Sequence, residues 1–113
     1  MTGLVVVGDL DVLVGRRDEL LELLAETQNR ARKEPGCESY AFAEVAGEPG
    51  HVLICQEWAD EPALEQHYRS AAFEQYQQRV GEFLARPSEV RIHHVRQTVR
   101  PQDGAPMDPR RAD

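Results

Sequence analysis

The first third of the chain changes from the pattern of a strand to the pattern of a helix. Residues 4–14 (LVVVGDLDVLV) are rich in β-branched side chains, and apolar and acidic residues alternate after Gly8, which predicts a strand. Its first half is apolar on both faces, so we expect each face to be covered. Over residues 16–33, apolar side chains recur every three or four positions among Arg, Glu and Gln, which predicts an amphipathic helix.

A turn and two further strands follow this helix. The sequence Glu34-Pro35-Gly36 predicts a helix-to-strand turn, because proline disfavours helical backbone before it and glycine accepts a positive φ. Alternating side chains predict strands over residues 37–45 and 51–58, and the glycine- and proline-containing loop between them predicts a hairpin.

The register of this hairpin decides which side chains share a face of the sheet. If the hairpin is centred between Glu48 and Pro49, Cys55 lies opposite Phe42. Trp58 and Tyr40 then lie on opposite faces, and a slip of one residue reverses this.

Two polar residues mark the starts of two further helices. Asp60 is expected to cap a short helix, and Ser70 is expected to cap a second helix that ends near Arg86-Pro87. Residues 88–99 predict the last strand, with a bulge at His93-His94 because the apolar positions change parity there.

The order of these elements predicts an α+β fold. Strand, helix, two strands, two helices and a strand match the ferredoxin-like split βαβ subunit, an antiparallel four-stranded sheet with helices on one face. The apolar run at residues 52–55 and the first strand give the bare face an apolar character. We therefore expect a second copy to cover it in a homodimer. The domain is expected over residues 1–100, followed by a flexible tail over residues 101–113.

Size and charge narrow the classes of partner. A chain of 113 residues forms one small domain, and its formal net charge of −7 argues against binding to nucleic acid or to anionic membranes. The longest apolar run, residues 4–7, is far too short to span a bilayer. The sequence has no signal-peptide pattern, and its two cysteines, Cys37 and Cys55, have neither a metal-ligand spacing nor a CxxC spacing. It therefore predicts a cytoplasmic protein with reduced thiols.

Several spaced motifs resemble the antibiotic biosynthesis monooxygenase (ABM) family. They are Glu34-Pro35-Gly36-Cys37 with Tyr40, Glu57-Trp58-Ala59-Asp60, Ala63-Leu64 with His67, and Phe73. The resemblance covers about residues 4–100 and implies a dimeric α+β barrel of ferredoxin-like subunits. It also implies oxidation of electron-rich phenols, anthrones or quinols by O2 without metal or flavin, although relatives degrade haem or isomerise small signalling molecules.

Two departures from the family limit what the resemblance implies. Haem-degrading relatives use a helix histidine and a strand asparagine, where this chain has Tyr76-Gln77-Gln78 and Gly8-Asp9, so haem degradation is disfavoured. Anthrone-oxidising relatives carry an asparagine on the strand of the tryptophan. Here Gln56 is the residue that can replace it as a hydrogen-bond donor.

Oxygenation without a cofactor requires a base, donors for a substrate anion and a dry aromatic cavity. His67 is the candidate base, because an ordinary histidine pKa near 6.5 suits proton transfer, and Trp58 is the candidate platform for a planar ring. The candidate substrate-binding residues are Tyr40, Phe42, Gln56, Tyr68, Phe73 and Tyr76. No metal site is expected, since His93 and His94 point to opposite faces of a regular strand.

The same residues also fit simpler interpretations. Trp58 can be a core residue, His67 a packed helix histidine, and the aromatic stripe of the last helix ordinary core packing. The alternatives to an oxygenase are a dimer that binds a small molecule without reaction, a purely structural dimer without a sizeable pocket, and an oxygen-independent isomerase. We expect His67 and Trp58 to line one cavity if the protein is an enzyme.

Overall fold

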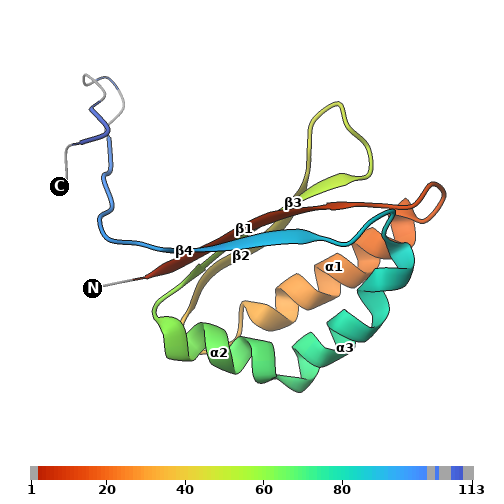
Figure 1. Cartoon of the computed structure of the whole chain (residues 1–113), viewed down its shortest axis with the longest axis horizontal. Helices are drawn as coiled ribbons and strands as arrows, with labels where there is room; N and C mark the ends of the chain where they lie inside the picture. The colour runs from red at the N-terminus through yellow and green to blue at the C-terminus, as the bar shows by residue number, and fades with distance from the viewer. Residues whose placement is uncertain (1–2, 102–103, 105–107, 111–113) are drawn as a thin grey trace.

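A four-stranded antiparallel sheet, with helices packed on one of its faces, forms the body of the molecule (Figure 1). This computed structural model describes residues 3–101, 104 and 108–110. The strands are β1 (Leu4–Asp11), β2 (Cys37–Glu44), β3 (His51–Trp58) and β4 (Glu89–His94), in the spatial order β2-β3-β1-β4. The helices are α1 (Arg17–Ala31), α2 (Glu61–Arg69) and α3 (Ala71–Val80), followed by a 3-10 turn (Gly81–Phe83). The predicted ferredoxin-like α+β class is confirmed.

Local capping explains where α2 and α3 begin. The backbone N–H of Ala63 donates to Oδ1 of Asp60 at 2.9 Å, and the N–H of Phe73 donates to Oγ of Ser70 at 3.1 Å. Each cap satisfies a donor that the first helical turn leaves without a partner. Both predicted caps are therefore confirmed, and Ser70 ends one helix and begins the next.

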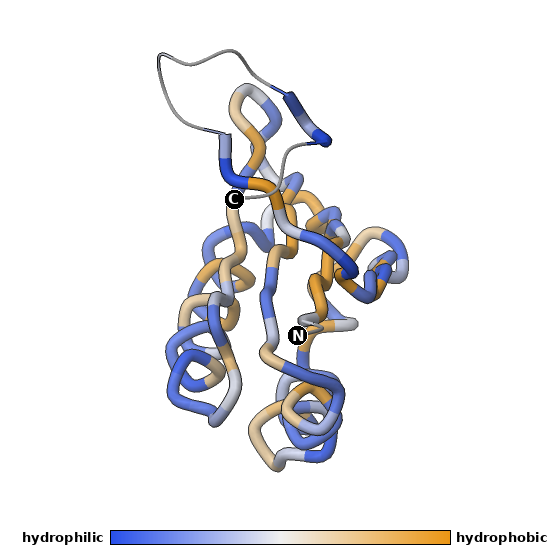
Figure 2. The backbone as a smooth tube through the Cα atoms, turned by 90° about the vertical axis from the view of Figure 1, so that its left-hand side faces the viewer, coloured by the Kyte–Doolittle hydropathy of each residue, from blue (hydrophilic) through white to orange (hydrophobic). Residues whose placement is uncertain are grey.

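The core lies between the helices and the sheet. Hydrophobic stretches run through the strands, whereas each helix changes between hydrophobic and hydrophilic residues as it winds (Figure 2). One group of buried side chains joins α1, α3 and the middle strands, and a second joins the ends of β1, β2 and β3 to α2. The second group includes Leu4, Val6, Ala31, Tyr40, Trp58 and Leu64.

The predicted hairpin register was wrong by one residue. Ala41, rather than Phe42, lies opposite Cys55. The loop is centred on Glu48, whose N–H donates to the carbonyl of Val45 and whose own carbonyl accepts from the N–H of His51. Because one step of register exchanges the two faces, Trp58 and Gln56 share the helix-covered face with Tyr40.

Three predicted elements are shorter than the sequence suggested. The first strand ends at Asp11 and the third helix at Val80. The last strand ends at His94 rather than residue 99, since His94 pairs with Leu4 at the start of β1 and one further backbone bond, from the N–H of Val95 to the carbonyl of Gly3, follows it. His93 and His94 pair regularly with β1, so the predicted bulge was wrong. Most of the predicted tail, residues 101–113, lies outside the described residues.

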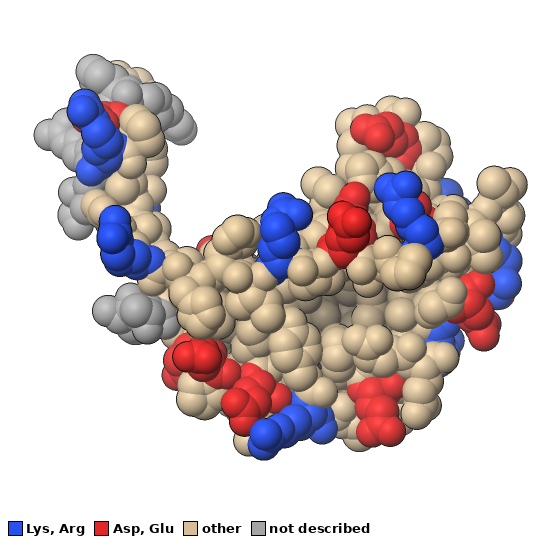
Figure 3. Space-filling model, in the orientation of Figure 1, with Lys and Arg blue, Asp and Glu red and all other residues tan. Residues whose placement is uncertain are grey.

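The second face of the sheet carries no helix in the described chain (Figure 1). Leu53 on β3 remains 45% exposed there, beside the exposed Cys55. Basic and acidic side chains are interspersed on the molecular face seen in Figure 3, without a basic patch on that face. Among the described residues, no helix is long and apolar enough to cross a membrane.

Candidate functional site

The structure brings all six predicted substrate-binding residues to one cavity between the sheet and the helices, here called the inner cavity. Strands β2 and β3 and helices α2 and α3 each contribute to it. Its lining includes Tyr40, Phe42, Gln56, Tyr68, Phe73 and Tyr76, with Val6, Ile54, Gln77, Ser88 and Val90. Aromatic rings therefore converge on one space, as the chemistry of the predicted site requires.

The inner cavity is small in this conformation. Its volume is about 50 Å³, whereas an engineered cavity of about 150 Å³ holds one benzene molecule. Its outer rim is accessible, because Tyr68 is 37% and Val90 46% exposed, and Figure 3 shows a hollow between the sheet edge and the helices. An aromatic substrate therefore requires side chains at this rim to move.

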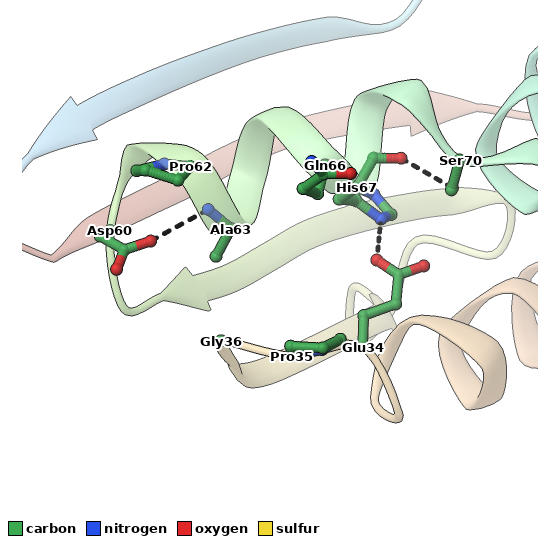
Figure 4. A pocket seen from close by; sticks show the side chains of 9 residues that line it. All are labelled: Glu34, Pro35, Gly36, Asp60, Pro62, Ala63, Gln66, His67 and Ser70. Carbon is green, nitrogen blue, oxygen red and sulfur yellow. Dashed lines mark hydrogen bonds and ion pairs between the residues drawn. The ribbon is translucent and has the colours of Figure 1, made fainter.

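His67 lies within the aromatic cluster beside the inner cavity. Its ring centroid is 4.8 Å from Trp58, 4.9 Å from Phe73 and 5.4 Å from Tyr40, and the residue is only 2% exposed. Nδ1 lies 2.7 Å from Oε1 of Glu34, in the turn after α1 (Figure 4). The side chain is thus held between a carboxylate on one side and aromatic rings on the other.

This pairing fixes which nitrogen of His67 carries the proton. A carboxylate accepts hydrogen bonds, so Nδ1–H donates to Glu34 and Nε2 keeps its lone pair in the neutral imidazole. Nε2 is the buried side-chain polar atom without a hydrogen-bond partner in the described part of the chain. Burial lowers the pKa of His67 below 6.5, although the hydrogen bond and charge of Glu34 oppose this shift. At neutral pH His67 is therefore an unprotonated base.

Glu34 is the site residue that the sequence did not reveal. Its motif with Pro35 and Gly36 predicts a turn and contributes to the family resemblance but indicates no role at the site, and 33 positions separate Glu34 from His67. Gly36 has a φ of +81°, and any side-chain carbon there would collide with Cβ of Ala63 on α2. The glycine lets the turn approach α2 closely, which brings the carboxylate of Glu34 to the imidazole.

We expect Gly36→Ala to destabilise the protein more than Gly47→Ala. Both glycines have positive φ, so both substitutions carry a backbone cost of roughly 1–2 kcal/mol. At Gly47 nothing lies within 4 Å of the added carbon, whereas at Gly36 it meets Ala63. Urea unfolding of the two variants measures the difference. Equal losses would show that the turn does not pack tightly on α2.

Gln56 and Trp58 form a hydrogen-bonded pair under the cavity. The indole Nε1–H of Trp58 donates to Oε1 of Gln56 at 2.9 Å, and both side chains are buried. Neither Trp58 nor His67 is among the residues that line the inner cavity, and His67 instead lines a separate groove together with Glu34. The expectation that His67 and Trp58 line one cavity was therefore wrong. Trp58 packs against the ring of His67 and fixes the amide of Gln56. The NH2 group of Gln56 is the remaining donor of that amide at the cavity.

The tyrosines of the site remain protonated at neutral pH. Burial raises the pKa of Tyr76 to about 12 and also raises the pKa values of Tyr40 and Tyr68. A phenol that keeps its proton can donate a hydrogen bond to an anion. The cavity therefore offers hydroxyl donors beside the amide of Gln56.

A larger groove of about 560 Å³ lies on the outer side of the Glu34–His67 pair (Figure 4). Its size alone would make it the default ligand site. Three of its polar side chains are, however, already paired: Asp60 caps α2, the hydroxyl of Ser70 donates to the carbonyl of His67, and Glu34 accepts from Nδ1–H of His67. The unpartnered Nε2 among the aromatic rings favours the inner cavity as the place of chemistry.

A titration of the two carboxylate-paired histidines checks this electrostatic description. We expect NMR to give His67 a pKa below 6.5 and His51 a pKa above 6.5, because burial dominates at His67 and the hydrogen bonds that His51 donates to Asp9 and Glu48 dominate at His51. Glu34→Gln should lower the pKa of His67 further, since the carboxylate holds it up.

The lowered pKa of His67 also determines how the stability of the fold changes with pH. The unfolded chain binds a proton at this histidine more readily than the folded protein, so the contribution of His67 is complete above pH 6.5 and is lost as pH falls through its folded pKa. A pKa of His67 above that of His51 would contradict the burial argument.

Comparison with known proteins places the chain among ABM proteins. The sequence model of the family described as "Antibiotic biosynthesis monooxygenase" matches residues 3–79. "Uncharacterized protein sll1783" of Synechocystis is 30% identical over 95 residues, which are 84% of this chain and 65% of that relative. The chain thus spans slightly less than two thirds of that protein's length.

Two further relatives link sequence and structure. "Putative monooxygenase Rv0793" of Mycobacterium tuberculosis is 33% identical over 67% of this chain and 74% of its own length. Its solved structure superposes with a TM-score of 0.75 and 28% identity, covering 92% of this chain and 99% of that chain. A conserved protein from Methanosarcina mazei gives a TM-score of 0.78 and 28% identity, covering 82% and 92%.

Proposed function

Because the chain belongs to the antibiotic biosynthesis monooxygenase family, we propose that it oxidises an electron-rich aromatic substrate, a phenol, quinol or anthrone, with O2 and no added cofactor. The observation that carries the proposal is the Nε2 atom of His67, which is buried without a partner among aromatic rings. Leaving a buried acceptor unpaired costs about 1–3 kcal/mol. A substrate hydroxyl that binds there would supply the missing donor.

The reaction can be written with the residues in place. Nε2 of His67 takes the acidic proton of the substrate, which leaves an electron-rich anion. The anion passes one electron to O2, and the resulting radical and superoxide combine into a C–O bond, giving a peroxide anion. The imidazolium returns its proton to this peroxide. With an anthrone, whose reacting carbon starts with two hydrogens, the O–O bond then breaks as that carbon loses its second hydrogen. A C=O group and one water molecule form, so both oxygen atoms are accounted for.

The surrounding residues would stabilise the anion and exclude water. The amide NH2 of Gln56 and the hydroxyl groups of Tyr40 and Tyr76 are donors at the cavity. Donors held in place before the reaction stabilise a developing charge without reorganisation. Glu34 would hold the tautomer of His67 and stabilise its protonated form, as a carboxylate does for a catalytic imidazole.

Oxygen consumption separates this function from two of the alternatives, a binding protein and an isomerase. We expect saturable O2 uptake with an anthrone or a naphthoquinol in a metal-chelated, flavin-free assay, with one O2 consumed per ketone formed and no hydrogen peroxide released. Conversion of the substrate without O2 uptake would indicate an isomerase. Tight binding without conversion of any substrate in the panel would indicate a binding protein.

We also propose that the protein works as a homodimer joined through the face of the sheet that carries no helix. Leu53 is 45% exposed on this face, beside the exposed Cys55, which pairs with Val7 of β1. We expect Leu53→Asp to raise the dimer Kd at least about 100-fold, because the interface would bury an unpaired charge. Sedimentation velocity measures this. Val14→Asp, in a fully exposed loop, is the control, and a monomeric wild-type protein at micromolar concentration would refute the proposal.

A further inference from the structure

One side of β4 forms an apolar strip that the helices leave uncovered. Ser88, Val90, Ile92 and His94 alternate onto the helix side of the sheet, where Val90, Ile92 and His94 face their β1 partners Gly8, Val6 and Leu4. The strip is roughly 20 Å long at about 3.3 Å per residue. Val90 is 46% and Ile92 44% exposed, so large apolar side chains face solvent beside the inner cavity.

The strip belongs to two separate hollows. Its first half, Ser88 and Val90, lines the inner cavity. Its second half, Ile92 and His94, lines a groove of about 290 Å³ between α2 and the end of the sheet, here called the edge groove. The other residues that line the edge groove are Leu4, Glu61, Leu64, Glu65, Tyr68 and Arg69.

Tyr68 is the residue that lines both hollows. Its ring centroid lies 5.1 Å from Phe73 and 5.6 Å from His67, and the side chain is 37% exposed. It therefore stands as a partition between the inner cavity and the edge groove. A partly exposed ring changes rotamer rapidly, and such a change joins the two hollows along the strip.

We propose that the edge groove is the subsite for the distal rings of a polycyclic phenol or anthrone, whose reacting ring lies in the inner cavity. This subsite rests on the proposed function. It explains how a polycyclic substrate is held although the inner cavity is small. Leu4, Leu64 and Ile92 give the groove an apolar floor for flat rings. Its rim is polar, with Arg69 held by Glu65 at 3.0 Å, which suits hydroxyl or carbonyl groups on the far end of the substrate.

Binding of an oxidised probe tests the subsite without turnover. Trp58 is the single tryptophan and lies beside His67, so quenching of its fluorescence reports occupancy. We expect 1,8-dihydroxyanthraquinone to bind, and Ile92→Phe to weaken it roughly 10-fold or more by filling the groove. Binding of the single-ring probe 4-nitrophenol should change less than about threefold. Val14→Phe, at an exposed loop position, is the matched control.

The partition is tested by the rate of binding. Stopped-flow quenching should show a faster association of the three-ring probe with Tyr68→Ala than with the wild type. The subsite is overturned if Ile92→Phe binds the three-ring probe as tightly as Val14→Phe does, if it weakens both probes equally, or if the wild type does not bind the three-ring probe. If the wild type oxidises no substrate but binds the three-ring probe, and Ile92→Phe weakens that binding, the oxygenase function is refuted and the subsite is supported.

Discussion

Replacing His67 with alanine is expected to lower kcat/KM for oxygen uptake by roughly 10²- to 10⁴-fold, the usual contribution of a positioned base. The substitution removes Nε2, the atom that faces the aromatic rings without a partner. Initial rates of O2 uptake, corrected for spontaneous oxidation, measure the loss. Far-UV circular dichroism must show that the variant is folded, because His67 is 2% exposed.

Two matched variants show whether the loss is specific. His51→Ala removes a histidine that also binds carboxylates, Asp9 and Glu48, but lies away from the cavity, and it should leave the rate within about twofold. Glu34→Gln keeps Nε2 and loses the charged partner of Nδ1, so its rate should fall between the wild type and His67→Ala. Equal rates for His67→Ala and His51→Ala would remove His67 from the mechanism.

Trp58→Ala is expected to be the most destabilising substitution, lowering the free energy of unfolding by about 3–5 kcal/mol as buried tryptophan truncations do. Trp58 is 0% exposed and contacts Tyr40 and His67. Urea unfolding followed by circular dichroism measures the change, since the variant loses its fluorescent residue.

Trp58→Phe separates the packing of the ring from its hydrogen bond. Phenylalanine keeps most of the ring but leaves Oε1 of Gln56 buried without its donor, which costs about 1–3 kcal/mol. If Trp58→Phe lowered the free energy of unfolding as much as Trp58→Ala does, the hydrogen bond, rather than the ring, would account for the stability that Trp58 provides.

Local signals were sufficient to predict most of the fold. The caps at Asp60 and Ser70 and the turn at Gly36 each depend on a few neighbouring residues, so the order of elements followed from the sequence. The aromatic residues of the inner cavity were identified from the needs of the chemistry. Alternation along β2 and along β3 divided the residues of each strand between two faces. Only the pairing register, which decides which faces of the two strands coincide, could not be predicted.

The errors arose where the answer depends on distant parts of the chain. Loop conformation sets the β2–β3 register, and the loop, with Gly47 and Gly50 at positive φ, is centred on Glu48 rather than between Glu48 and Pro49, which shifts the pairing by one residue. That step brings Trp58 to the face of Tyr40. Nothing next to Glu34 distinguishes it from other carboxylates at a helix end. Its role appears only when the turn packs against α2.

The most direct test of the central claim, that His67 is the base of the site, observes proton transfer without oxidation. 1,8-Dihydroxyanthrone is titrated with the protein under nitrogen, and the absorption of the bound ligand distinguishes the anion from the neutral form. We expect an anion band with the wild type and none with His67→Ala at the same bound fraction and pH. A neutral bound ligand in the wild type, or the same anion band in His67→Ala, would contradict it.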